Sequence, residues 1–333
     1  MGTAQFETLA EDRREAAQTA LRSALGSVPV DAMVPLTGGI TTATVFRVDA
    51  GGRRYVLRVE GEPSPLRNPH QYQSLQIAAE AGIAPRLHYF DATDRVAIID
   101  FIAHRPLASF AGGPLARAQA LGRLRRALAE TSLFPHHVDY PDKVARLWAH
   151  VNRTGLFAPG VLDPVNERLA EIRETYVWDR ADSVSSHNDP VPANILYDGE
   201  RLWLIDWESG CRNDPLVDVT ILCDHLARTP ELEAALLDAW LGSAPDEALL
   251  VRLPLVRALI RLFYAGVMFS VSATAPRARA DTSLSAPTLA ELEAAFYAGR
   301  VKLGTRALNH VVGKMLVASF LTGCAPPAFI VDV

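Results

Sequence analysis

A histidine, two aspartates and an asparagine stand close together in the stretch from Ser186 to Asp218. His187, Asp189 and Asn194 form a His-x-Asp-x-x-x-x-Asn pattern, and Asp206 follows twelve residues after Asn194. An aspartate can accept the proton of an attacking hydroxyl group. An asparagine and a second aspartate offer the hard oxygen ligands that Mg²⁺ prefers, and Mg²⁺ in turn binds nucleotide phosphates. These residue types therefore predict phosphoryl transfer, with Asp189 as the base and with Asn194 and Asp206 as magnesium ligands.

Two short apolar segments between these polar residues would bring them together. Residues 195–197 and 202–205 are apolar, and an Asp-Gly turn signal separates them, which predicts a β-hairpin. A loop of four residues would set Asn194 opposite Ile205 and so beside Asp206, about one strand spacing or 5 Å away. A loop of two residues would shift this register, so the predicted chemistry favours the longer loop.

The order of base, amide ligand, strand and carboxylate ligand is that of the catalytic residues of protein kinases. Short patterns of this kind also arise by chance, as ordinary turn acids beside a buried hairpin. Here three positions follow in order, and a further acid, Glu208, comes two residues after Asp206. The sequence therefore favours a kinase-like site over ordinary turn acids.

The stretches HNDPVPANIL, LIDWE and NDPLVD resemble the aminoglycoside phosphotransferase/choline kinase superfamily, and most closely its choline/ethanolamine kinase branch. The resemblance implies an α+β, protein-kinase-like fold of two lobes. Residues 1–102 would form a β-rich nucleotide-binding lobe with a leading helix. Residues 103–333 would form a mainly helical lobe for catalysis and substrate binding, and ATP would bind between the two lobes with Mg²⁺.

The same resemblance implies roles for particular residues. Asp189 would be the catalytic base, accompanied by His187 as a catalytic residue. The metal ligands would be Asn194 and Asp206, and Glu208 would hold or orient a second ion. Asp218 would support the catalytic loop, and the backbone of the segment from Asp100 to Ile102 would meet the adenine edge.

The expected phosphate-binding residues lie in a strand-rich segment over residues 33–60. The strand over residues 55–59 carries one cation among its apolar residues, Arg58, where a kinase has a lysine. A guanidinium group suits phosphate oxygens, although an edge-strand arginine with its head in water is the alternative. A glycine loop between two strands lets backbone N–H groups approach phosphates, and the LTGGITT sequence is similar to the nucleotide loop of choline kinase-like proteins. The loop residues expected to bind the nucleotide are Gly38, Gly39, Thr41 and Thr42.

A helix is expected over residues 68–81, where a kinase has a glutamate that pairs with the strand cation. Gln71 stands at that place and adds no charge, and Glu80 lies too close to the helix end. The partner of Arg58 therefore stays open. If Gln71 meets Arg58, the substitution Gln71→Glu is expected to be tolerated and to tighten ATP binding.

Most of the remaining sequence has helical periodicity, apart from two short strands over residues 86–91 and 95–99. A polar, proline-containing linker covers residues 275–287. The expected helices span residues 6–25, 115–128, 142–151, 163–176, 219–226, 231–241, 246–271 and 289–321.

The acceptor is predicted to be a small alcohol with a cationic nitrogen, choline or ethanolamine first. The resemblance to the choline/ethanolamine kinase branch implies it, and the C-terminal helices carry aromatic residues that attract ammonium groups. Tyr264 and Asp224 are the candidates for binding it, while Ser209 stands where the choline kinase-like pattern often has an aromatic residue. An aminoglycoside, a sugar or a thiamine-like alcohol are alternative acceptors, and a catalytically weak nucleotide-binding module is an alternative class. A protein kinase is disfavoured, because the segment after Asp206 is short and lacks Ala-Pro-Glu.

Composition agrees with an enzyme that binds a small molecule. The 333 residues are 49% hydrophobic and carry a net charge of −5, which argues against nucleic acid or an anionic membrane as the main partner. We find neither the pattern of a signal peptide nor an apolar stretch of about 20 residues. The three cysteines, Cys211, Cys223 and Cys324, lack metal-ligand spacing and suit a reducing cytoplasm.

Overall fold

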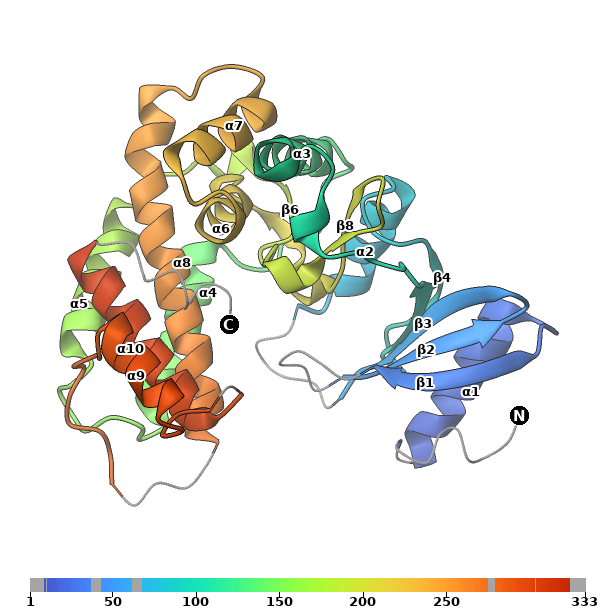
Figure 1. Ribbon diagram of the computed structural model, residues 1–333, viewed down its shortest axis with the longest axis horizontal. Coiled ribbons are helices and arrows are strands. Elements are labelled where there is room, and N and C mark those ends of the chain that lie inside the picture. Colours follow the sequence, from blue (N-terminus) through green and yellow to red (C-terminus); the bar gives the residue numbers. More distant parts are fainter. Residues whose placement is uncertain are drawn as a thin grey trace.

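The computed structural model describes residues 9, 11–36, 43–61, 68–274, 279–302 and 304–323. It consists of an antiparallel sheet with helices on the N-terminal side and a larger, mainly helical part on the C-terminal side, as predicted (Figure 1). The chain passes from the first part to the second through residues 101–106, directly after the last strand of the sheet.

The N-terminal sheet has the strand order β1-β2-β3-β5-β4, with every neighbouring pair antiparallel. Alternate residues of the strands point to one face, as the period of two requires. That face, which includes Phe46 and Leu57, packs on buried alanines of helix α1. The elements are α1 (Glu11–Leu25), β1 (Val30–Leu36), β2 (Thr44–Ala50), β3 (Arg53–Val59), β4 (Leu87–Asp91) and β5 (Val96–Asp100).

Helix α2 (Gln71–Glu80) links this sheet to the segment that carries the predicted metal ligands. The Ser74 hydroxyl and the Asn68 amide both donate to the carbonyl oxygen of Gly210, at 2.7 and 2.6 Å. A β-carbon at Gly210 would lie 3.1 Å from Trp207 and 3.3 Å from Ser74, so the close approach of the helix favours a glycine here.

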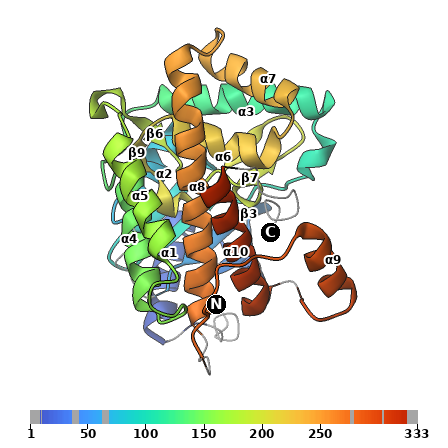
Figure 2. The same cartoon turned by 90° about the vertical axis from the view of Figure 1, so that its left-hand side faces the viewer.

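The helical part is built around the long helix α8, which lies between α4 and α10 (Figure 2). Gly313 of α10 lets the two helices approach, because a β-carbon there would lie 2.5 Å from the Phe269 ring. Trp148 of α4 donates its indole N–H to the Leu262 carbonyl at 2.9 Å. The helices are α3 (Gly113–Ala129), α4 (Tyr140–Arg153), α5 (Asp163–Thr175), α6 (Leu216–Leu226), α7 (Pro230–Leu241), α8 (Glu247–Ala273), α9 (Leu289–Tyr297) and α10 (Arg306–Thr322).

The prediction of one helix over residues 289–321 is wrong, because the segment forms two helices. Helix α9 ends at Tyr297, and both Gly299 and Gly304 have positive φ angles, a conformation that a helix cannot continue through. The Thr305 hydroxyl then accepts a hydrogen bond from the Leu308 amide and caps α10. Of the predicted leading helix over residues 6–25, the described part begins at Glu11.

Two small hairpin-like sheets carry the motif residues. Strands β7 (Ile195–Tyr197) and β8 (Leu202–Leu204) pair in the register of the four-residue loop, as predicted. Strand β6 (Val184–Ser186) pairs with β9 (Cys211–Asn213), so the two ends of the segment that carries the motif residues lie next to each other. Among the helices in the described parts of the chain, none is long and apolar enough to cross a membrane.

Candidate active site

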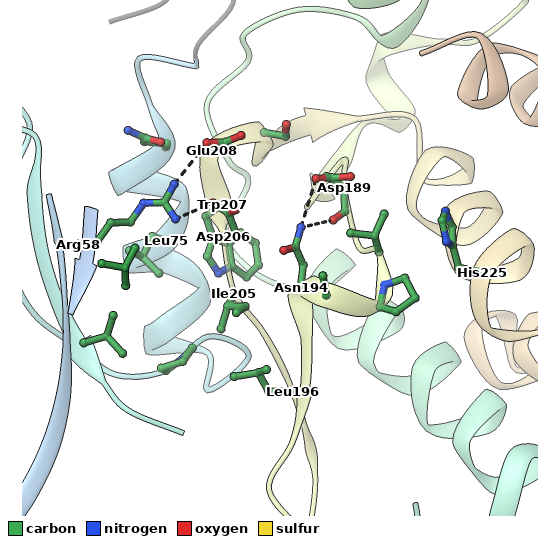
Figure 3. Close-up of a pocket in the computed structure, with 18 of the residues that line it drawn as sticks. Arg58, Leu75, Asp189, Asn194, Leu196, Ile205, Asp206, Trp207, Glu208 and His225 are labelled. Atoms are coloured by element: carbon green, nitrogen blue, oxygen red, sulfur yellow. Dashed lines mark hydrogen bonds and ion pairs between the residues drawn. The ribbon is translucent and has the colours of Figure 1, made fainter. Parts of the chain in front are cut away.

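Asn194 and Asp206 lie side by side at the open end of the β7–β8 hairpin (Figure 3). The Ile205 amide donates to the Asn194 carbonyl at 3.0 Å, which continues the strand pairing by one residue. Asp206 then turns with a φ of 64°, in the left-handed region that aspartate tolerates better than most residues. The hairpin therefore places Asn194 and Asp206 next to each other, as its predicted register required.

A buried carboxylate, that of Asp218, holds the loop that carries Asp189. Asp218, on α6, accepts hydrogen bonds from the backbone amides of His187 at 2.9 Å and Asn188 at 2.7 Å. Arg125, on α3, lies 3.5 Å from Asp218 and is 2% exposed. Asp218 therefore supports the catalytic loop as the resemblance implied, with Arg125 as a charge partner that the sequence analysis missed.

His187 was predicted to be a catalytic residue, but its position makes it a structural one. It is completely buried, and its Nε2 lies 2.8 Å from the carbonyl oxygen of Ile205. Burial lowers the pKa of its imidazole, so the neutral form is favoured. An imidazole without solvent access cannot contact a substrate, and His187 instead joins the Asp189 loop to the hairpin.

Asp189 is the group best placed to accept a proton. The Tyr264 hydroxyl donates to one of its carboxylate oxygens at 2.7 Å, and the Asn194 side-chain amide approaches the other at 3.2 Å. Burial raises the pKa of Asp189 to about 7, although the Tyr264 hydrogen bond and the charge of Lys143 oppose this shift. Such a carboxylate is basic enough to act on a hydroxyl group near neutral pH.

Arg58 is paired with three carboxylates rather than with Gln71. Its guanidinium group lies 3.5 Å from Glu60, 2.9 Å from Asp206 and 3.3 Å from Glu208. Burial opposes its charge, but the three carboxylates outweigh burial and raise the pKa of Arg58. The guanidinium thus connects the N-terminal sheet to the hairpin segment (Figure 3).

Glu60 is the residue that takes the place of the expected helix glutamate. It is 2% exposed, and its second oxygen accepts a hydrogen bond from the Gln71 side-chain amide at 2.8 Å. The expectation that Gln71→Glu would restore a charge pair is therefore wrong, because residue 71 faces a carboxylate. The signal was present in the sequence, since Arg58 and Glu60 are two residues apart and an extended chain that continues just past the end of β3 places both on one face.

The residues at the end of the hairpin suit Mg²⁺. Asp206 Oδ1 is buried and accepts no hydrogen bond from the described residues, and Arg58 is its charge partner. The amide nitrogen of Asn194 donates to Asp189, which directs the amide oxygen elsewhere. Mg²⁺ binds through one or two carboxylates together with phosphates and water, so Asp206, Asn194 and Glu208 form a fitting donor set. Across the described ranges no group of three or more His, Cys, Asp or Glu side chains forms a cage of its own.

These residues surround one cavity of about 850 Å³, which extends from the sheet to α8. Arg58, Asp189, Asn194, Asp206 and Glu208 all line it.

At the sheet end, the cavity is lined by the segment that was expected to meet adenine. Asp100 is fixed by His88, whose Nε2 lies 2.7 Å from its carboxylate. Ile102 lines the cavity, and its backbone forms no hydrogen bond with another of the described residues. The predicted phosphate loop with Gly38, Gly39, Thr41 and Thr42 lies outside the described residues.

On the other side of Asp189 the cavity is lined by residues of α6, α8 and α10. Tyr264 lies here, as predicted. Asp224 also lines the cavity, but its carboxylate is paired with Arg257 at 2.6 Å and lies 3.9 Å from Arg261. Its predicted role as counter-ion of a substrate cation is wrong, because two arginines already balance its charge.

The face of Phe263 is also occupied. The Lys143 ammonium lies 4.7 Å from the centre of that ring and donates to the Ser209 hydroxyl at 3.1 Å. Ser209 is the residue that stands where the choline kinase-like pattern often has an aromatic one. No sequence pattern marked Lys143, because it lies near the start of a helix that is far along the chain from the motif residues.

The chain is similar to several known proteins. Among curated proteins, Protein LicA of Haemophilus influenzae is 39% identical over 54 residues, which are 16% of this chain and 20% of that protein. The match thus spans about a fifth of the length of that relative. The solved structure of choline kinase LicA from Streptococcus pneumoniae matches with a TM-score of 0.64 and 14% identity, over 93% of this chain and 99% of that one.

A spectinomycin phosphotransferase solved with ADP and spectinomycin matches with a TM-score of 0.55 and 12% identity, over 92% of this chain and 98% of that one. These two likenesses concern the fold. The family model described as "Phosphotransferase enzyme family" matches residues 32–251, about two thirds of the sequence, including all motif residues of the site. The chain therefore belongs to the phosphotransferase enzyme family.

Proposed function

We propose that the enzyme transfers the γ-phosphoryl group of ATP to the hydroxyl group of a small amino alcohol of the choline or ethanolamine kind. The charge of the cavity is the observation that carries this proposal, because an excess of carboxylates favours cationic ligands. Those ligands would be Mg²⁺ with the nucleotide and an ammonium group on the acceptor. With Asp224 and Arg261 left aside as neutralised, the acidic side chains of the cavity are Glu60, Asp100, Asp189, Asp206 and Glu208, against the single arginine Arg58.

Asp189 accepts the proton of the acceptor hydroxyl, the resulting oxygen attacks the γ-phosphorus, and ADP leaves with the β–γ bridging oxygen. Arg58 binds phosphate oxygens at the sheet side, and the backbone of Ile102 meets the adenine edge. Asp206 and Asn194 would hold Mg²⁺, with Glu208 holding or orienting a second ion. The bound metal supplies positive charge to the phosphates, so that most of the catalysis is positioning and charge stabilisation.

The acceptor would lie beyond Asp189, against Tyr264 and the apolar side chains of α8 and α10. We assign the ring contact with an ammonium group to Tyr264, because Lys143 already covers the face of Phe263. Free, buried thiols at Cys211 and Cys223 suit a reducing compartment, and we place the enzyme in the cytoplasm.

Steady-state kinetics with choline, ethanolamine, 3,3-dimethylbutanol, a sugar alcohol and an aminoglycoside test the acceptor. Dimethylbutanol has the shape of choline without its charge, so we expect its kcat/KM to be lower by a factor of about ten, corresponding to the 1–2 kcal/mol of a desolvated cation–π contact. Equal use of dimethylbutanol, or reaction of the sugar alcohol or aminoglycoside alone, would exclude the amino alcohol. The phosphotransferase activity itself would stand in either case.

A further inference from the structure

Lys143 is a partly buried cation whose charge acts on the proposed base, Asp189. It lies in the first turn of α4, and its ammonium group donates to Ser209 and faces the ring of Phe263, both of which line the cavity. Burial lowers the pKa of Lys143, whereas the negative charges of Asp189 and Glu208 support its protonated form. The ammonium is therefore placed in the electrostatic field of the reacting groups.

The surroundings of Lys143 leave its charge without a direct counter-ion. Within the described part of the chain, no carboxylate lies within ion-pair distance of its ammonium group. One hydroxyl and one ring face satisfy a lysine poorly, because an ammonium group has three donors and is costly to remove from water. An anion that enters the cavity would complete its coordination.

The two arginines that line the cavity have carboxylate partners of their own. Arg58 is paired with three carboxylates on the sheet side, and Arg261 lies beside Asp224. The catalytic loop contributes no charge between Asp189 and Asn194, where its sequence is Pro-Val-Pro-Ala. A transferring phosphoryl group spreads negative charge over three oxygens and is stabilised by a lysine, an arginine or a metal ion aimed at it.

We infer that Lys143 is a further catalytic residue, whose ammonium group binds the phosphoryl group as it passes from ATP to the acceptor oxygen. The inference rests on the proposed role of Asp189 as base. In this step the acceptor O–H gives its proton to Asp189, the bond between the acceptor oxygen and the γ-phosphorus forms, and the bond from that phosphorus to the β–γ bridging oxygen breaks. Lys143 stays protonated throughout, and ADP leaves with the bridging oxygen.

Lys143→Met tests this role, because it keeps the length of the side chain and removes the charge. We expect kcat to fall by about 10²–10³-fold, as for other groups that stabilise a transition state, while the Kd of Mg·ATP from calorimetry stays within about threefold. Lys143→Arg should recover part of kcat. Arg146→Met is the matched control, since Arg146 is an exposed cation on the same helix and should leave kcat unchanged.

Two readouts separate this inference from the identity of the acceptor. The slow hydrolysis of ATP uses water as acceptor, and it should lose rate in Lys143→Met by a similar factor. Binding of Mg·ADP with aluminium fluoride, which imitates the transferring phosphoryl group, should weaken about as much, while binding of a non-hydrolysable ATP analogue should not. A purely structural lysine would weaken both nucleotide complexes alike.

The inference is overturned if Lys143→Met keeps kcat and aluminium fluoride binding within threefold. It is also overturned if the substitution changes only the KM of the alcohol, because Lys143 would then bind the acceptor. If Lys143→Met does not fold, Lys143→Gln decides, because it also removes the charge. Unchanged aluminium fluoride binding in Lys143→Gln would exclude the role, and a loss without loss of the ATP analogue would support it.

Discussion

The substitution Gln71→Glu tests whether Glu60, rather than residue 71, is the charge partner of Arg58. In Gln71→Glu two carboxylates would face each other where a hydrogen bond of 2.8 Å now joins Gln71 and Glu60, both less than 10% exposed. The loss of a hydrogen bond to a charged group costs about 1.5–3 kcal/mol, and two like charges about 4 Å apart at an effective dielectric constant of 20 repel by about 4 kcal/mol. Arg58 offsets part of this repulsion. We therefore expect the free energy of unfolding to fall by about 2–4 kcal/mol at pH 7.5.

The double variant Glu60→Gln/Gln71→Glu restores one carboxylate and one amide with their places exchanged. It should recover stability to within about 1 kcal/mol of the natural chain, so that the two substitutions show a strong coupling in a double-mutant cycle. Urea denaturation followed by tryptophan fluorescence measures this, and calorimetry measures the Kd of Mg·ATP. The matched control is Gln76→Glu, because Gln76 bonds Glu80 at 2.9 Å on the exposed side of the same helix, and its loss should cost only a few tenths of a kcal/mol.

The cost of Gln71→Glu should also depend on pH. Two facing carboxylates raise the pKa of the pair in the folded protein above the value near 4.3 of an unfolded glutamate. The protonated pair is compatible with the folded site, so the destabilisation is full above the raised pKa and fades as the pH falls towards 5. If Gln71→Glu kept its stability at pH 7.5 and bound Mg·ATP more tightly, residue 71 would face Arg58, and the arrangement around Glu60 would be refuted.

Three further substitutions probe the site. Asp189→Ala should lower kcat at least 10²-fold while calorimetry shows Mg·ATP still bound, and near-normal turnover would rule out the base. Asp206→Ala should abolish the part of nucleotide affinity that depends on Mg²⁺, and an unchanged Kd with and without the metal would contradict its role as ligand. Arg125→Ala leaves Asp218 buried without its charge partner and should cost about 3–5 kcal/mol in urea denaturation; a loss below 1 kcal/mol would show that the pair contributes little to stability.

Local sequence patterns were sufficient to predict most helices and strands and the order of the site residues along the chain. The period of two in β2 and β3, the apolar segments around the Asp-Gly turn and the helical stripes depend on neighbours close in sequence, which is why they could be predicted. The hairpin register followed from the requirement that Asn194 and Asp206 meet. The break between α9 and α10 was missed because glycine in a helical pattern is ambiguous until its φ angle is known.

The partners of the charged residues were decided by tertiary structure alone. Arg58 meets Asp206 and Glu208 across the two parts of the fold, and Asp224 is neutralised by arginines of another helix. Lys143 reaches Ser209 and Phe263 from a helix with no motif of its own. A sequence shows which residues carry charge, but the energy of a charge depends on its burial and on neighbours within a few ångströms. Those neighbours are set by how helices and strands distant in the chain pack together.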